Sequence, residues 1–160
     1  MTRKLVGIGL LLALAASVRP GQAQDFALRL GTACEGSNTP KCGAALGLVL
    51  GGGDTRSVST VTTRYLPDGR FAQTFSTGAE RTLFTTKRAS LFASGQAGVE
   101  LTSGGSSGLG HGALGLLIPV YKRDDYQFSI VPIGSAGNAP AEGGSWNGGF
   151  SVSIQVDFRE

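Results

Sequence analysis

Apolar and polar residues alternate with a period of two along most of the chain, a pattern that predicts β-strands whose two faces meet different surroundings. The last segment shows this most completely. Its large apolar residues are Phe150, Val152, Ile154, Val156 and Phe158. The residues between them are Ser151, Ser153, Gln155 and Asp157. Similar alternation begins at Phe26, so the chain is predicted to be all-β.

Clusters of glycine, proline and aspartate divide the chain after residue 24 into eight alternating segments. The predicted strands are residues 25–33, 43–51, 56–66, 70–84, 89–102, 109–121, 126–136 and 148–158. Gly78 interrupts the fourth of them. Eight is an even number, so both chain ends are expected on the same side of the sheet. The period alone fits a soluble β-sandwich and a membrane barrel equally well.

The first 23 residues have the features of a secretory signal. A basic start at Arg3 and Lys4 is followed by an uncharged apolar run, and small residues precede a cleavage site expected after Ala23. We therefore predict a cleaved signal peptide at 1–23, export from the cytoplasm and a single domain at 24–160.

Charge is scarce and balanced in the predicted mature chain. Charged residues make up 16% of the sequence, against a usual share of about 25%. Once Arg3, Lys4 and Arg19 are removed with the signal peptide, basic and acidic residues are equal in number. A neutral chain offers no electrostatic basis for binding nucleic acid, so we exclude nucleic acid as a partner.

The two cysteines, Cys34 and Cys42, are predicted to form a disulfide because an exported chain folds in an oxidising compartment. The residues between them include Gly36, Asn38 and Pro40, which predict a loop. A redox or metal site would need further ligands, and the mature chain has a single histidine. We therefore expect no metal and no cofactor.

Isolated charges lie at mid-strand on the face that otherwise carries glycine, alanine, serine and threonine. A sheet facing water would carry many lysines and glutamates there, whereas a narrow barrel interior needs small side chains and a few paired charges. The expected polar network of such a lumen is Arg29, Arg64, Glu80, Gln96, Glu100 and His111. The apolar face then points outward into lipid.

Aromatic residues gather near the predicted strand ends, as in the aromatic girdles at membrane interfaces. The expected interfacial aromatics are Tyr65, Phe84, Tyr121, Tyr126, Trp146 and Phe158. Ordinary packing at strand ends is the alternative explanation for any one of them.

By these patterns the mature chain resembles the small eight-stranded outer-membrane barrels of the OmpA/OmpX type. Residues 78–98 are similar to a strand, periplasmic turn and strand common in that group. The strand from Phe150 to Phe158 resembles the assembly signal read by the barrel-insertion machinery, although Arg159 and Glu160 follow the final aromatic residue. The resemblance implies an antiparallel up-and-down transmembrane barrel in the bacterial outer membrane, with both termini in the periplasm.

Residues for catalysis are sparse. Some eight-stranded barrels deacylate lipid A with a histidine and a nearby serine on one strand, but the position two residues after His111 is Ala113. Ser106 and Ser107 precede His111 and are a weak substitute. We expect His111 to be a polar residue of the barrel interior or rim.

The sequence therefore predicts a non-enzymatic outer-membrane barrel with a side-chain-filled lumen and a structural or surface-interaction role in the cell envelope. The expected partners are outer-membrane lipid and, by the resemblance, the barrel-assembly machinery, and we expect a monomer. Two alternatives stay open: a secreted soluble β-sandwich or lipocalin-like binding protein, and a lipid A-modifying barrel enzyme.

Overall fold

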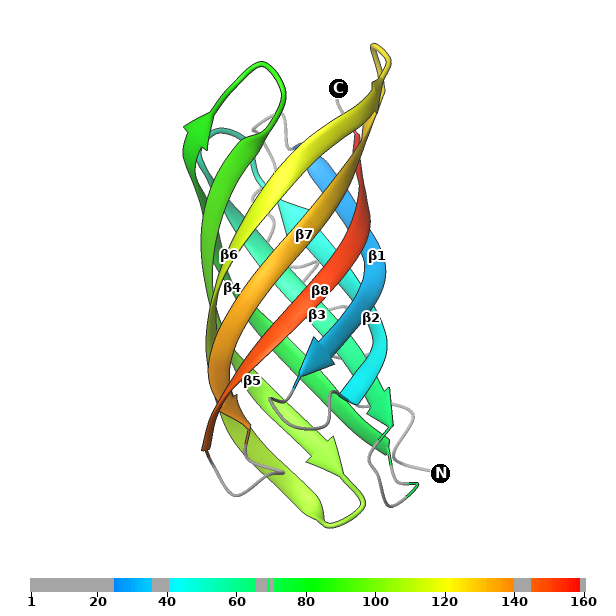
Figure 1. Cartoon of the computed structure of the whole chain (residues 1–160), viewed down its shortest axis with the longest axis vertical. Coiled ribbons are helices and arrows are strands. Elements are labelled where there is room, and N and C mark those ends of the chain that lie inside the picture. The colour runs from blue at the N-terminus through cyan, green and yellow to red at the C-terminus, as the bar shows by residue number, and fades with distance from the viewer. Residues whose placement is uncertain (1–24, 36–40, 66–68, 70, 140–144, 159–160) are drawn as a thin grey trace.

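The fold is a closed antiparallel barrel of eight strands, in which each strand pairs with the next and β1 closes on β8 (Figure 1). The computed structural model describes residues 25–35, 41–65, 69, 71–139 and 145–158. The strands are β1 Phe26–Glu35, β2 Lys41–Leu50, β3 Thr55–Tyr65, β4 Phe71–Thr85, β5 Ser90–Thr102, β6 Gly105–Lys122, β7 Tyr126–Ala139 and β8 Ser145–Phe158. The predicted fold class and strand number are confirmed. The predicted signal peptide lies outside the described residues.

Two strands, β6 and β8, begin three or more residues earlier than the sequence predicts. β6 starts at Gly105 rather than at residue 109, because Thr102 pairs with Gly105 across a tight turn and Gly105 takes a φ of +143°. β8 starts at Ser145, which pairs with Ala139 of β7. Both hairpins therefore extend into segments that were expected to be loops.

Gly78 does not interrupt β4. It pairs with Val58 on one side and Gln96 on the other. A Cβ at Gly78 would lie 1.9 Å from the carbonyl oxygen of Gly95. Glycine is required there because the curved wall brings the neighbouring backbone too close for any side chain.

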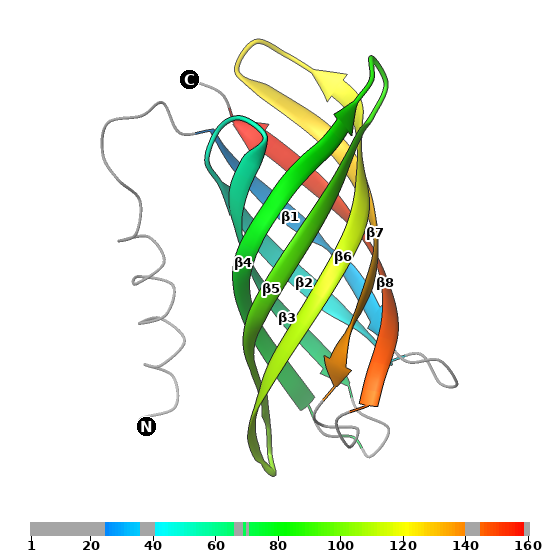
Figure 2. The same ribbon diagram turned by 90° about the vertical axis from the view of Figure 1, so that its left-hand side faces the viewer.

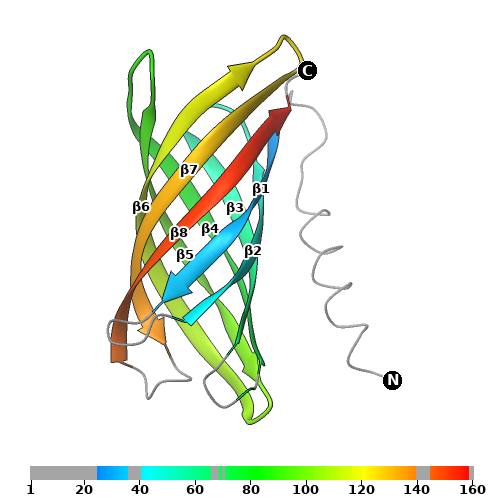
Figure 3. The same ribbon diagram turned by 45° about the vertical axis from the view of Figure 1, so that its right-hand side comes forward.

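The strands are staggered around the barrel. A path that starts at Phe26 and moves to the register partner in each following strand reaches Gly148 of β8. Gly148 is the neighbour of Gly149, which pairs with Glu35 at the other end of β1, so the path does not return to Phe26. A barrel closed with such a stagger must have strands that tilt relative to its axis. Figure 2 and Figure 3 show the tilted strands from two other sides.

Large apolar side chains lie on the outside of the barrel and charged ones on the inside. Leu30 is 65% exposed and Ile154 57%, whereas Glu80 is 1% and Glu100 2% exposed. This is the reverse of a soluble protein, in which carboxylates are rarely buried and leucines usually are. The alternation read from the sequence therefore places its apolar face outward on β1 and β8.

The outer faces of β3 and β4 depart from this rule. Ser57, Ser59 and Thr77 point outward with Gln73 and Arg81, so the expectation of an apolar outer face on every strand is wrong for this hairpin. No helix in the described ranges is long and apolar enough to cross a membrane.

Candidate functional site: the barrel lumen

A five-residue ion and hydrogen-bond network crosses the lumen. Arg29 on β1 donates two hydrogen bonds to Glu80 on β4, at 2.6 and 2.9 Å. Arg56 on β3 donates to the same carboxylate at 2.6 Å. On β8, Gln155 accepts a hydrogen bond from Nε of Arg29 and donates one to Asp157, which lies 3.6 Å from Arg56. The network therefore joins four strands across the barrel.

The centre of this network, around Glu80, is well satisfied for a buried one. Arg29, Glu80 and Gln155 are all buried, and Glu80 is shared by two guanidinium groups. Buried charges are tolerated where each has partners of the opposite sign and hydrogen bonds for its remaining atoms. The arrangement joins opposite parts of the barrel wall across the lumen.

Two apolar clusters fill the lumen near the end at which β1 begins and β8 finishes, the terminal end. One consists of Phe92, Leu117 and Val131, and the other of Ala27, Val49 and Val58. The Phe92 ring lies 4.9 Å from the guanidinium carbon of Arg29, a cation–π distance. A Cβ at Gly115 would lie 2.3 Å from Cζ of Phe92, so Gly115 makes room for this ring.

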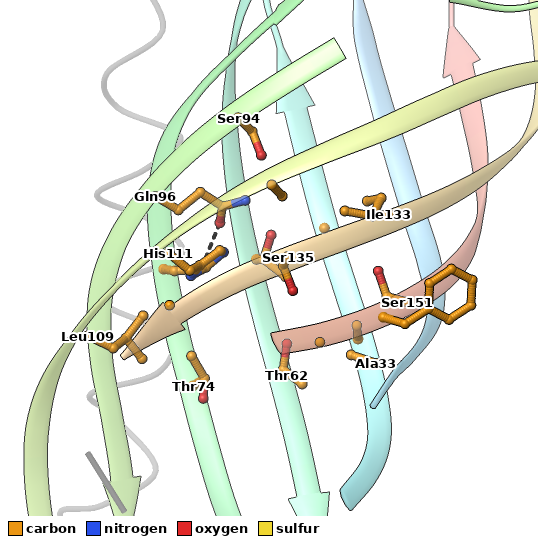
Figure 4. Close-up of a pocket in the computed structure, with 18 of the residues that line it drawn as sticks. Ala33, Thr62, Thr74, Ser94, Gln96, Leu109, His111, Ile133, Ser135 and Ser151 are labelled. Carbon is orange, nitrogen blue, oxygen red and sulfur yellow. Dashed lines mark hydrogen bonds between the residues drawn. The ribbon is translucent and has the colours of Figure 1, made fainter. Parts of the chain in front are cut away.

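A polar cavity of about 130 Å³ lies on the other side of Arg29, away from the terminal end (Figure 4). Arg64 on β3 and Glu100 on β5 form a buried ion pair in its wall. Gln96 accepts a hydrogen bond from Ser76 at 2.7 Å, and its register partner on β6 is His111. Further lining residues are the hydroxyl-bearing Thr60, Thr62, Thr74, Ser94, Ser135 and Ser151. The cavity wall therefore combines hydroxyls and one ion pair with small and apolar residues such as Ala33 and Ile133.

The structure divides the six residues expected in the lumen into two groups. Arg29 and Glu80 belong to the five-residue network, while Arg64 pairs with Glu100 in the cavity wall. Gln96 and His111 also line the cavity.

Three members of the network were missed from the sequence. Arg56, Gln155 and Asp157 are polar residues that alternate with outward-facing ones, and Arg56 is in phase with Arg64. Their strand phase was the signal that could have found them.

His111 lines the cavity, but the two serines considered as its partners do not. Within the described ranges, no group of three histidine, cysteine or acidic residues could hold a metal ion. Ser106 and Ser107, the serines considered as partners for His111, lie exposed at the start of β6, whereas His111 is half-buried.

The disulfide between Cys34 and Cys42 is confirmed. The two cysteines are register partners in β1 and β2, with their Cα atoms 4.0 Å apart, rather than residues of the loop itself. Residues 36–40, the predicted loop between them, lie outside the described residues. The bridge therefore clamps the end of a strand pair.

Aromatic pairs occur at both ends of the barrel. At the terminal end Phe26 stacks on Phe158, and Tyr126 contacts Tyr121 at a centroid distance of 6.1 Å. At the opposite end the ring centroids of Tyr65 and Phe71 are 4.2 Å apart. Among the other residues expected at the interfaces, Phe84 is exposed near the end of β4. Trp146 lies in β8 with its side chain outside the described residues.

The barrel is similar to solved structures of small outer-membrane proteins. Neisserial surface protein A (NspA) matches with a TM-score of 0.57 and 7% sequence identity, covering 87% of this chain and 98% of that one. The N-terminal barrel domain of Pseudomonas aeruginosa OprF gives a TM-score of 0.44 with 15% identity, covering 84% and 99% of the two chains. Yersinia pestis Ail, solved in complex with the heparin analogue sucrose octasulfate, gives 0.41 with 11% identity, covering 87% and 100%.

The sequence matches no family model and no curated protein. At 7% identity, the match to Neisserial surface protein A establishes the fold alone. It confirms the expected resemblance at that level: the chain folds as a small eight-stranded barrel of the kind found in bacterial outer membranes.

Proposed function

We propose that this protein is an integral barrel of the bacterial outer membrane, with a non-enzymatic role in envelope structure or surface interaction. The single observation that carries the proposal is the inside-out distribution of polarity: Leu30 and Ile154 are exposed while Glu80 and Glu100 are buried. In water those apolar side chains would favour aggregation. In lipid they meet hydrocarbon, and the closed barrel leaves no unpaired sheet edge.

The terminal end is proposed to face the periplasm. β1 begins and β8 ends there, since Phe26 and Phe158 are register partners, as expected for an exported chain whose signal peptide, proposed at 1–23, is removed on the periplasmic side. The strand from Phe150 to Phe158 is the proposed recognition signal for the barrel-assembly machinery. Aromatic residues at the two ends would then sit at the two membrane interfaces.

The lumen is proposed to be closed to ions and solutes. Eight strands leave an interior that side chains just fill. Here Phe92 with its apolar neighbours and the network around Glu80 occupy the half of the lumen next to the terminal end. The hydroxyl-lined cavity is then a blind pocket rather than part of a pore.

Membrane extraction tests the location. Membranes that contain the protein are washed with alkaline carbonate, and unheated and boiled samples are compared on a denaturing gel. We expect the protein to stay in the membrane pellet and to change mobility on boiling, because a closed barrel resists detergent until it is heated. Release into the supernatant would refute the proposal and favour the soluble binding protein.

The closed lumen and the absence of catalysis have separate tests. Protein reconstituted in planar bilayers should leave the conductance at its protein-free baseline. Lipid A incubated with the purified protein in detergent should keep its mass. If the parent protein deacylates lipid A and the His111→Ala variant does not, the enzyme alternative is established instead.

A further inference from the structure

One side of the outer surface is unlike the rest. β1, β7 and β8 present leucine, isoleucine, valine and phenylalanine outward near their middle. On β3 and β4 the outward residues include Ser57, near the start of β3, and Ser59 and Thr77, near mid-strand. The hydroxyl oxygens of Ser59 and Thr77 are 3.1 Å apart, and both are exposed on the outer surface. Polar groups facing lipid at this depth are unfavourable, so an occupant other than lipid is expected there.

Small residues extend this polar surface around the barrel. Two neighbouring rows of register partners, all pointing outward, form what we call the small-residue band. The first row is Ser57, Ala79, Gly95 and Gly112, and the second is Ser59, Thr77, Ala97 and Gly110. Because the strands tilt, these rows rise along the barrel axis as they pass from β3 to β6. Figure 2 shows β4, β5 and β6 side by side on this side of the molecule.

The fold itself does not require glycine in this band. A Cβ at Gly95 would meet no atom within 4 Å, and one at Gly112 would meet only the carbonyl oxygen of Ser94, at 3.8 Å. Gly78 and Gly98, which point inward, differ: a Cβ at either would lie 1.9 Å from a neighbouring carbonyl oxygen. Steric crowding within one copy of the chain therefore does not explain these two outward glycines.

Two opposite charges lie side by side at the terminal end of the band. Arg81 points outward from β4 opposite Thr55, and Asp54 immediately precedes Thr55. The amide of Thr82 donates to the carbonyl oxygen of Asp54 at 2.7 Å, so Asp54 lies across from the residue that follows Arg81 in β4. Both side chains are exposed, and within the described residues no ion pair joins either to another group.

This pair of charges is complementary to itself. A two-fold axis parallel to the barrel axis, lying just outside the wall in front of β3 and β4, exchanges left and right. It brings the long Arg81 side chain of one copy toward Asp54 of the other, and the reverse, so that two ion pairs can form. The hydroxyls of Ser57, Ser59 and Thr77 are likewise self-complementary, because each can donate and accept.

We propose that a second copy of this chain packs against the small-residue band, with the two barrels side by side in the membrane. Small residues let the two walls approach closely, which is how packed surfaces gain contact energy in lipid. The contact also removes the band's hydroxyls from hydrocarbon. This inference rests on the proposed membrane location, and it replaces the monomer expected from the sequence.

Cysteine cross-linking in intact outer membranes tests the interface. The only cysteines of the chain, Cys34 and Cys42, are bonded to each other, so an added cysteine supplies the one reactive thiol. Ala79→Cys and Ser57→Cys place it in the band, on the two strands that flank the two-fold axis. Val152→Cys, on β8, places it outward at mid-strand on the opposite side of the closed barrel. We expect oxidation to give covalent dimers with the first two variants and none above background with Val152→Cys.

Two further changes separate the second copy from other occupants. With Ala79→Cys as the reporter, Arg81→Glu should lower the dimer yield about fivefold, as loss of a pair of weak ion pairs would. Adding Asp54→Arg should restore the yield, since the exchanged charges are again complementary. Gly95→Trp should abolish cross-linking, while Gly134→Trp, also outward with no atom within 4 Å of its Cβ, should leave it unchanged.

The same membranes are extracted with carbonate and run with and without boiling. Protein that is released refutes the membrane location. Protein that is retained and heat-modifiable, yet cross-links no better from the band than from Val152→Cys, overturns the dimer alone. If Arg81→Glu abolishes cross-linking and Asp54→Arg does not restore it, Arg81 contacts a lipid headgroup. That result also overturns the dimer.

Discussion

Phe26, the first residue of β1, stacks on Phe158, the last residue of β8, with ring centroids 4.5 Å apart and planes inclined by 13°. The two residues are register partners in the pair of strands that closes the barrel. Closure joins segments from the two ends of the chain, so it carries the largest loop-closure entropy of any strand pairing in the fold. The stacked rings stabilise the seam where that cost is greatest.

We therefore expect Phe158→Ala and Phe26→Ala to be strongly coupled. A stacked aromatic pair contributes about 0.5–1.5 kcal/mol beyond the area it buries, and the double variant should show a coupling energy of that size. The measurement is a double-mutant cycle of urea unfolding in lipid vesicles. Phe150→Ala, an outward residue of the same strand, is the control and should be additive with Phe26→Ala. Additivity of Phe26→Ala with Phe158→Ala would contradict the prediction.

Removing the Glu80 carboxylate should strongly destabilise the barrel. Glu80→Gln leaves Arg29 and Arg56 without their shared counter-charge, and breaking a buried ion pair in this way costs about 3–5 kcal/mol. Glu100→Gln, which leaves Arg64 without its counter-charge, is the comparison and should cost less because one guanidinium group is affected rather than two. Urea unfolding followed by the heat-dependent gel shift measures both. Equal stabilities of Glu80→Gln and the parent protein would show that the network does not support the fold.

Gly115 should tolerate no side chain while Phe92 is present. Gly115→Ala forces its Cβ to within 2.3 Å of the Phe92 ring, and overpacking of this kind costs about 1–3 kcal/mol. Adding Phe92→Leu should recover part of that loss, since the smaller side chain leaves room for the new methyl group. Gly134→Ala, whose Cβ meets no atom within 4 Å, is the matched control and should be neutral. Unfolding midpoints in urea distinguish these outcomes.

The disulfide between Cys34 and Cys42 should stabilise the folded barrel modestly. It closes a short loop, with a sequence separation of 8, and the chain-entropy model gives a stabilisation of about 2–3 kcal/mol for such a ring. Cys34→Ser with Cys42→Ser should lower the unfolding free energy by that amount. Reductant should lower it equally in the parent protein and leave the double variant unchanged. Unreduced, denatured parent protein should take up no alkylating label.

Local patterns determined the architecture of this protein. The alternation from Phe150 to Phe158 shows within one segment which side chains share a face, because neighbouring residues of a strand point in opposite directions. Counting such segments gave eight strands, and the presence of only Cys34 and Cys42 behind a secretory signal gave their pairing. These features depend on residues close together in the chain, so the sequence displays them directly.

The closed barrel alone decided which residues meet across the lumen. Arg29 and Glu80 are 51 residues apart, and their contact depends on the stagger with which all eight strands close, a quantity that no single segment encodes. The same stagger separates Arg64 and Glu100 from them and brings in Arg56. It also aligns Ser57, Ala79 and Gly95 on one outer surface. Strand identity is a local property, whereas the level and direction of each side chain around the barrel follow from closure.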